Sequence, residues 1–339
     1  VLIQGPKWCG KTTTASQQAM SVLNIDHPQK MKEYLMLAEN NPEVLMDGEV
    51  PRLLDEWQLT PQLWDTARYL IDQRGLTGQF IFTGSAVPAD RSKISHTGTG
   101  RFAWLTMRPM SLWESEESNG RISITDLFAG EMKSCVAPDN TLDEMAYLIC
   151  RGGWPGTLGK KRDAALRMAF NYVKAICEND ISRVDDTHRD ADFALRLMRV
   201  YARHQGGQVP VSMLYSDLKA NGGDSLTENT ISLYLSALKK IFVIEDMPAW
   251  NPNLRSKTAI RTSDPRYFVD PSVATAALGL GPKDLMKDLS TFGLLFETMA
   301  VRDLRVYSDA IDGRVYHYRD HNGLECDTVV HLPNGHYGL

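Results

Sequence analysis

The chain opens with Val1-Leu-Ile-Gln4, Gly5-Pro-Lys-Trp-Cys-Gly-Lys-Thr12 and Thr13-Thr-Ala-Ser-Gln-Gln-Ala-Met20. A short apolar run, a loop that two glycines bound and a segment without Gly or Pro predict a strand, a loop and a helix that runs to about Leu23. The pattern G-x-x-x-x-G-K-[ST] in that setting is typical of a phosphate-binding loop, or P-loop. We therefore expect an α/β fold with a nucleotide site at its N-terminal end.

The loop residues have distinct expected roles. Gly5 and Gly10 let the backbone curl so that its N–H groups point at phosphate oxygens, and the start of the following helix adds partial positive charge. Lys11 is expected to contact the β- and γ-phosphates and Thr12 to bind Mg²⁺, with Thr13 as a candidate for the α-phosphate. The other expected nucleotide-binding residues of the loop are Pro6, Lys7, Trp8 and Cys9.

Composition limits the possible classes. The chain has 339 residues, of which 43% are hydrophobic, so two or three globular domains are expected. A net charge of −5 gives no overall attraction to nucleic acid or anionic membranes. No apolar run reaches the ~18 residues of a membrane span, no signal peptide is visible, and the five cysteines form no C-x-x-C pair. We expect a cytoplasmic protein, and because a strand starts at Val1 the native N-terminus is expected to lie upstream.

A second candidate motif is Pro51-Arg-Leu-Leu-Asp-Glu-Trp57, a short apolar run that ends in two carboxylates. This is the form of a Walker B element, in which Asp55 would hold Mg²⁺ and Glu56 would polarise the water that attacks the γ-phosphate. Most Asp-Glu pairs are solvated surface charges. The position of this pair after a P-loop favours the functional interpretation.

Further candidates follow a helix predicted from Pro61 to Arg74. Gln79 to Ser85 is expected to be a buried strand whose terminal Thr83 or Ser85 senses the γ-phosphate or orients water; the alternative is a turn that caps the strand. Arg101 follows a polar loop and is a candidate arginine finger, in cis or on a neighbouring subunit of a homo-oligomer. An ordinary surface arginine is the alternative.

Several segments together carry a resemblance to a known family: Gly5 to Thr12, Pro51 to Trp57, Phe82-Thr-Gly-Ser-Ala86, Gly100-Arg101, Met107-Arg-Pro-Met-Ser-Leu112 and Arg151-Gly-Gly-Trp-Pro-Gly156. As a set they resemble the large prokaryotic family of predicted AAA-superfamily ATPases with an uncharacterised C-terminal domain, the last segment being similar to that family's GG-x-P segment. The resemblance implies ATP as the ligand and an added catalytic glutamate. It carries roles to Lys11, Thr12, Asp55 and Glu56, and also to Thr83, Ser85, Arg101 and Arg151.

The middle of the chain is predicted to be helical. Helices are expected at Thr141 to Cys150 and Arg162 to Asp180, then at Phe193 to His204, Val211 to Lys219 and Thr227 to Lys240. The last three precede two predicted strands, Ile241 to Glu245 and Arg266 to Val269, which is the order of a winged helix. Basic residues in the predicted wing (Arg255, Lys257, Arg261, Arg266) make DNA a possible partner, with a protein contact as the alternative.

The C-terminal segment contains a second pair of candidate carboxylates. Glu297 lies in a predicted helix from Phe292 to Arg302, and Asp327 lies in the second of two strands, Val315 to Tyr318 and Glu325 to Val330. This arrangement resembles the opening of the PD-(D/E)xK nuclease core. The chain ends at Leu339 before an E-x-K, so this domain is expected to be incomplete, and structural pairing of the two carboxylates is the alternative.

The sequence thus predicts a P-loop ATPase core (1–135), a helical connector (136–190), a winged-helix-like domain (191–278) and a partial nuclease-like α/β domain (279–339). The predicted activity is Mg²⁺-dependent hydrolysis of ATP. The alternative is a nucleotide-gated module that hydrolyses slowly and docks DNA or protein. A small-molecule kinase is disfavoured because Glu56 follows Asp55 as a water-positioning carboxylate.

Overall fold

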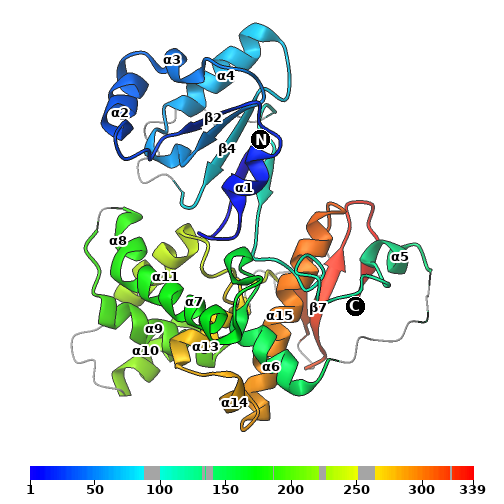
Figure 1. The fold of residues 1–339 in the computed structure, drawn as a ribbon. Coiled ribbons are helices and arrows are strands. Elements are labelled where there is room, and N and C mark those ends of the chain that lie inside the picture. The colour runs from blue at the N-terminus through cyan, green and yellow to red at the C-terminus, as the bar shows by residue number, and fades with distance from the viewer. Residues whose placement is uncertain are drawn as a thin grey trace. The chain divides into compact units, whose positions relative to one another are not determined.

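The computed structural model describes residues 1–87, 100–131, 134, 140–185, 187–220, 227–250, 264–320 and 323–339. The chain forms two compact units (Figure 1). The first contains Val1–Met107, Ser182–His188 and Lys240–Phe242, and the second contains Arg108–Ile181, Arg189–Lys239 and Val243–Leu339. The division into four domains stays a prediction. Within the described residues no helix is long and apolar enough to cross a membrane.

The first unit is built on a parallel sheet whose described strands have the order β2-β3-β4-β1-β5. The strands are β1 (Leu2–Gln4), β2 (Ser21–Asn24), β3 (Arg52–Asp55), β4 (Phe80–Gly84) and β5 (Trp104–Thr106). Leu2 pairs with Phe82 of β4 and with Trp104 of β5, so β1 lies inside the sheet. Because all the strands run in one direction, the segments that follow β1, β3 and β4 meet at the same edge.

Alternation along the strands explains how helices cover both faces of this sheet. Leu2, Leu54 and Phe82 join one buried cluster with α2 (Met31–Asn40), α3 (Pro42–Met46) and α4 (Leu63–Arg74). Their neighbours in the strands, Ile3, Leu53 and Ile81, pack with Ala15 of α1 (Lys11–Ser16) on the opposite face. Full burial of each such side chain contributes about 1.5–3 kcal/mol, so the short strands are stabilised chiefly by packing.

The first helix is shorter than predicted. It ends at Ser16, and Ser21 to Leu23, predicted as the end of the helix, belong to strand β2 (Ser21–Asn24), which is paired with β3. The Ser16 hydroxyl donates to the Thr12 carbonyl (2.7 Å), and the last turn tightens to three-residue hydrogen bonds. A hydroxyl side chain that hydrogen-bonds a backbone carbonyl slightly destabilises the helix. Pairing with β3 stabilises the extended conformation at Val22.

The second unit is mainly helical. Its longer helices are α6 (Leu142–Arg151), α7 (Arg162–Ala175), α9 (Ala191–Arg203), α10 (Val211–Ala220), α11 (Glu228–Lys240), α13 (Pro271–Leu278) and α15 (Leu289–Asp309). Shorter helices are α5 (Ile124–Phe128) and α14 (Pro282–Leu285), and a π-helical turn at Ile176–Asp180 leads into α8 (Ile181–Arg183), where the chain passes to the first unit. An antiparallel sheet of β6 (Arg314–Arg319), β7 (Glu325–His331) and β8 (Tyr337–Gly338) packs on α15 (Figure 1).

The helices predicted between Thr141 and Lys240 are confirmed within a few residues, whereas α15 (Leu289–Asp309) runs beyond the predicted end at Arg302. Thr141 and Glu144 form the capping box that starts α6. The two strands predicted after α11 (Ile241 to Glu245 and Arg266 to Val269) do not form as continuous strands, and these segments are joined by an isolated antiparallel bridge between Ile244 and Phe268. Arg255, Lys257 and Arg261 of the predicted wing lie outside the described residues. Arg266 is not an exposed wing cation, because it is buried and its Nε donates to the Val209 carbonyl (2.7 Å).

A buried aspartate joins distant parts of the second unit. Asp270 has no exposed surface and accepts hydrogen bonds from the Gly153 amide (2.9 Å) and from Ser272, while it forms an ion pair with Arg302 of α15 (2.8 Å). A Cβ on Gly153 would lie 2.0 Å from the Met110 carbonyl oxygen. The Gly-Gly-x-Pro segment is therefore needed here for close backbone approach inside this unit.

Candidate nucleotide site

The candidate site lies at the edge of the parallel sheet where β1, β3 and β4 end. The Gly5–Thr12 loop follows β1, Asp55 is the last residue of β3, and Thr83 is next to last in β4. Three predicted motifs that are tens of residues apart in the chain thus meet at one place. In open parallel sheets this edge is where ligands bind.

The loop has the strongly curved backbone that phosphate binding requires. Gly5, Trp8 and Gly10 have φ angles of 155°, 67° and 98°, and Gly10 caps α1. A Cβ on Gly5 would lie 2.0 Å from the Met107 carbonyl oxygen, so only glycine fits there. Successive amides in such a curve form a concave nest that binds anions.

Lys11 is held inside the loop. Its side chain is 6% exposed, and its Nζ donates to the carbonyl oxygen of Pro6 (2.6 Å). Burial lowers the pKa of the Lys11 ammonium, an effect that the nearby carboxylates of Glu56 and Asp55 oppose. A cation in this position is ready to exchange a backbone carbonyl for phosphate oxygens.

Asp55 accepts hydrogen bonds from two hydroxyl groups. Its Oδ1 accepts from Thr12 Oγ1 (2.9 Å) and from Thr83 Oγ1 (2.5 Å), so the P-loop, β3 and β4 are connected through one oxygen atom. A hydroxyl beside a carboxylate supplies the hard oxygen ligands that suit Mg²⁺, which takes only one or two protein ligands besides phosphates and water. Among the described residues, no group of three or more His, Cys, Asp or Glu could hold a metal ion. The donor set therefore fits Mg²⁺ that arrives with a nucleotide better than a permanently bound metal.

Glu56 is next to Asp55 but faces different partners. Its backbone is in the left-handed region (φ 57°, ψ 41°), which is costly for a residue other than glycine. Its Oε2 accepts from Ser85 Oγ (3.2 Å) and from the side-chain amide of Gln58. Burial raises the pKa of Glu56, and the hydrogen bond from Gln58 opposes this effect. Gln58 was not predicted, because no periodicity or motif in the sequence shows that its side chain returns to Glu56.

The remaining predicted loop residues differ in exposure. Pro6 and Cys9 are buried, and the Cys9 thiol approaches the Met107 carbonyl (3.6 Å), while burial raises its pKa. Thr13 and Trp8 are exposed, and Lys7 is partly buried. Cys9 therefore supports the loop through its side chain, and its backbone is the part available to phosphate.

Arg101 is not part of this edge. Its Nε donates to Asp72 Oδ1 (2.6 Å), near the end of α4 and before β4 begins. Arg101 itself precedes β5, whose first residue, Trp104, pairs with Leu2 at the start of β1. It therefore lies toward the opposite end of the strands from the P-loop, and the structure does not support a finger in cis.

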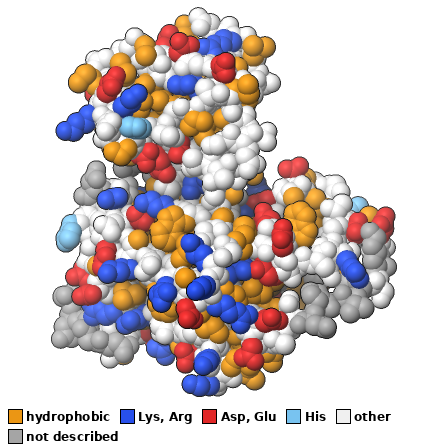
Figure 2. All heavy atoms as spheres, in the orientation of Figure 1, with side chains coloured by type: hydrophobic (Ala, Val, Ile, Leu, Met, Phe, Trp, Pro, Cys, Tyr) orange, Lys and Arg blue, Asp and Glu red, His pale blue; other side chains and the backbone are white. Residues whose placement is uncertain are grey.

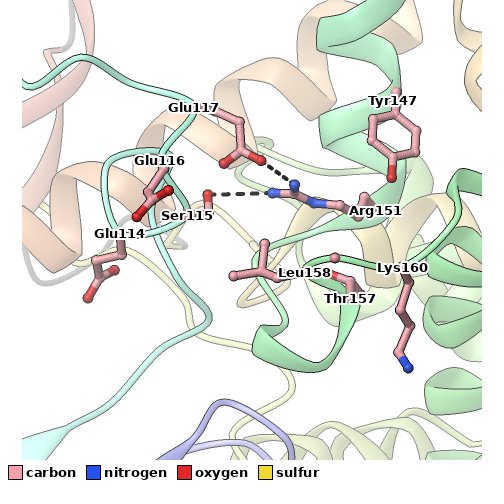
Figure 3. Close-up of a pocket in the computed structure, with 10 residues that line it drawn as sticks. Glu114, Ser115, Glu116, Glu117, Tyr147, Arg151, Thr157, Leu158 and Lys160 are labelled. Carbon is pink, nitrogen blue, oxygen red and sulfur yellow. Dashed lines mark hydrogen bonds and ion pairs between the residues drawn. The ribbon is translucent and has the colours of Figure 1, made fainter.

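Arg151 belongs to the second unit, where it lines a pocket of about 410 Å³. Figure 3 shows its guanidinium pointing to Glu117 and Ser115, with which it forms an ion pair and a hydrogen bond (3.4 Å for the latter). Tyr147, Thr157 and other residues complete the lining. The observed partners of Arg151 are thus protein groups of its own unit.

Glu297 and Asp327 do lie near each other in the second unit. The Tyr267 hydroxyl donates to Glu297 Oε1 (2.5 Å). Burial raises the pKa of Glu297, and the charge of Asp327 on β7 adds to the effect. The described residues bring no third metal-binding group to this pair, and the tyrosine contact agrees with the structural alternative.

Two family models match the chain. Residues 1–116 match a model described as an AAA domain, and residues 142–284 match one described as a domain of unknown function (DUF8612). The first match agrees with the P-loop and with the parallel sheet, so the chain has an AAA-like P-loop core that is followed by a largely helical region. An AAA domain implies nucleotide binding. The matched ranges end at residue 284, and a nuclease-like C-terminal domain is not shown by them.

Solved structures give a weaker likeness. The Walker-type ATPase PABY2304 of Pyrococcus abyssi is 18% identical, with 82% of this chain and 90% of that chain covered at a TM-score of 0.46. The RuvB Holliday junction branch migration motor of Thermotoga maritima is also 18% identical, with 73% and 81% covered at a TM-score of 0.30. No curated protein matches the chain significantly.

Proposed function

We propose that the first unit hydrolyses ATP to ADP and phosphate in a Mg²⁺-dependent reaction. Lys11 and the amides of the Gly5–Thr12 loop hold the phosphates and stabilise the charge that develops on them. Thr12 and Asp55 would hold Mg²⁺, which supplies charge neutralisation at the β- and γ-phosphates. Glu56 accepts hydrogen bonding from the attacking water and orients it.

The observation that supports this proposal best is the shared hydrogen bonding at Asp55. One carboxylate oxygen of Asp55 accepts from Thr12 of the P-loop and from Thr83 of β4. Lys11 precedes Thr12 in the chain and Glu56 follows Asp55, so both side chains come from segments that this hydrogen bonding joins. A site that only bound a nucleotide would need the loop and Lys11. A partly buried carboxylate after Asp55, which accepts hydrogen bonds from Ser85 and Gln58, is the feature that hydrolysis needs in addition.

Phosphate release and nucleotide binding, measured on the same variants, test the proposal. Lys11→Ala is expected to lose nucleotide binding. Glu56→Gln keeps the shape of the side chain and is expected to bind ATP while turnover falls by at least about 100-fold. If the wild-type chain releases no phosphate with ATP and Mg²⁺, or if Glu56→Gln turns over at the wild-type rate, the proposed reaction is wrong.

The second candidate function is a nucleotide-gated module that docks DNA or protein and hydrolyses slowly. Helices α9, α10 and α11 and the bridge between Ile244 and Phe268 favour it, because this order agrees with a winged helix. On the face of the second unit in Figure 2, basic and acidic side chains are interspersed, which gives DNA no extended positive surface there. Stimulation of phosphate release by double-stranded DNA would favour DNA as the partner, and its absence would favour a protein.

Two finer predictions remain part of the proposal. Arg101 is exposed and paired with Asp72, and it could act as a finger only at the site of a neighbouring subunit in a homo-oligomer. Sedimentation with and without ATP and Mg²⁺ tests for that oligomer. Nuclease activity through Glu297 and Asp327 is tested with Mg²⁺ and linear DNA, and the contact of Glu297 with Tyr267 argues for no cleavage.

A further inference from the structure

We propose that Gln58 is a positioning residue for Glu56, and that Gly84 provides the space in which it works. This inference rests on the proposed hydrolysis, since it concerns how the water-orienting carboxylate is held. It assigns a role to a residue that neither the P-loop nor the Asp55-Glu56 pair includes.

The first support is the geometry at the Glu56 carboxylate. The amide of Gln58 and the hydroxyl of Ser85, which belong to different segments of the chain, both donate to Oε2. In the part of the chain that the structure describes, no protein group donates to Oε1, which leaves this oxygen to accept a hydrogen bond from water. A carboxylate with one oxygen fixed by two donors has a defined direction, which matters because a displacement of about 1 Å can cost about 100-fold in rate.

The second support is the backbone that brings the two side chains together. Glu56 is in the left-handed conformation, and a short 3-10 turn, Trp57–Leu59, follows at once. This turn folds the chain so that the side chain of residue 58 returns to residue 56. The left-handed conformation of Glu56 is unfavourable, and the hydrogen bond from Gln58 that it makes possible offsets part of that free-energy cost.

The third support is the absence of a side chain at residue 84. A Cβ on Gly84 would lie 2.8 Å from Gln58 Oε1 and 3.0 Å from Trp57 Nε1. Gly84 has no positive φ angle, so backbone conformation does not demand glycine at this position. A side chain at this position would instead have to displace the Gln58 amide or the Trp57 ring. Gly84 separates Thr83, which contacts Asp55, from Ser85, which contacts Glu56.

One buried atom supports the view that this amide serves the site. Gln58 Oε1 is buried and has no hydrogen-bond partner in the described structure. The side chain thus leaves its oxygen unpaired while its amide nitrogen donates to Glu56. A glutamine that only filled space would be replaced by an apolar side chain without loss. Methionine has nearly the same shape and carries no donor, which makes the comparison possible.

The experiment compares Gln58→Met and Gln58→Ala with the wild type by phosphate release over a range of ATP concentrations. Both variants are expected to lower kcat by about 10- to 100-fold, with KM for ATP and the melting temperature close to wild type. Gln58→Met with a wild-type kcat would overturn the inference, because packing alone would then explain the residue. A kcat above wild type would also overturn it, since Gln58 would then restrain Glu56.

Gly84→Ala tests the second half of the inference. It is expected to lower kcat to the level of Gln58→Met, and to add little when it is combined with that variant, because both act by removing the same hydrogen bond. A full additional loss in the double variant would show that Gly84→Ala acts through Trp57. Failure of the proposed function can be told apart from failure of this inference. A wild-type chain that does not hydrolyse ATP, or an active Glu56→Gln variant, rejects both. If the wild type is active, Glu56→Gln is inactive and Gln58→Met is fully active, only the role of Gln58 is rejected.

Discussion

Replacement of Glu245 by glutamine is predicted to destabilise the second unit at neutral pH and to change how its stability depends on pH. Both carboxylate oxygens of Glu245 accept from Arg108 (2.7 and 2.8 Å), and Arg305 lies 3.5 Å from one of them. Burial would raise the pKa of Glu245, but the two arginines outweigh it and lower the pKa to about 2. The folded state therefore favours the ionised form.

The size of the effect follows from that difference. Relative to the usual 4.5, a pKa of about 2 corresponds to at most about 3 kcal/mol, and because the side chain is 33% exposed we expect about 2 kcal/mol after solvent screening. This contribution is complete above the unfolded-state pKa and is lost as the pH falls from about 4.5 towards 2. At about pH 3.5 roughly 1 kcal/mol of it should already be lost, since the unfolded glutamate is mostly protonated there.

Urea unfolding of the full chain, followed by far-ultraviolet circular dichroism at neutral pH and near pH 3.5, measures both quantities. Glu245→Gln should be less stable than wild type at neutral pH, and the gap should narrow in acid. Asp309→Asn, which removes the more exposed partner of Arg108, is the matched control and should cost less. An equal gap at both pH values would refute the assignment of this pKa shift to Glu245.

Three further predictions concern other parts of the chain. Gly153→Ala should destabilise the second unit by about 3 kcal/mol, because its Cβ would meet a backbone carbonyl at 2.0 Å. Gly293→Ala, in α15 with no atom within 4 Å of its Cβ, should instead stabilise by about 0.5–1 kcal/mol, and urea unfolding compares the two. Thr83→Val removes a donor to Asp55 and should raise the Mg²⁺ concentration needed for half-maximal phosphate release by about 10-fold. Arg101→Ala should leave kcat unchanged at concentrations where the chain is monomeric, and a large loss there would contradict its placement away from the P-loop.

The amino-acid sequence alone determined the type of site and most of the local elements. Gly5, Gly10 and Lys11 occupy fixed spacings because phosphate binding depends on local backbone curvature, which a short stretch of sequence specifies. The ends of β3 and β4 could be predicted for the same reason: apolar runs followed by polar residues mark where buried strands stop. The long helices of the second unit likewise follow from their hydrophobic spacing and caps.

Only the tertiary structure decided which distant groups meet. It placed β1 between β4 and β5, turned Gln58 back onto Glu56, and paired Arg101 with Asp72 away from the P-loop. It also made Ser21 to Leu23 strand where helix was predicted, because pairing with β3 outweighs local helix preference. Local patterns record the conformation that a segment prefers. The partner of a buried charge or of a strand depends on the packing free energy of segments far apart in the chain, which a local pattern does not contain.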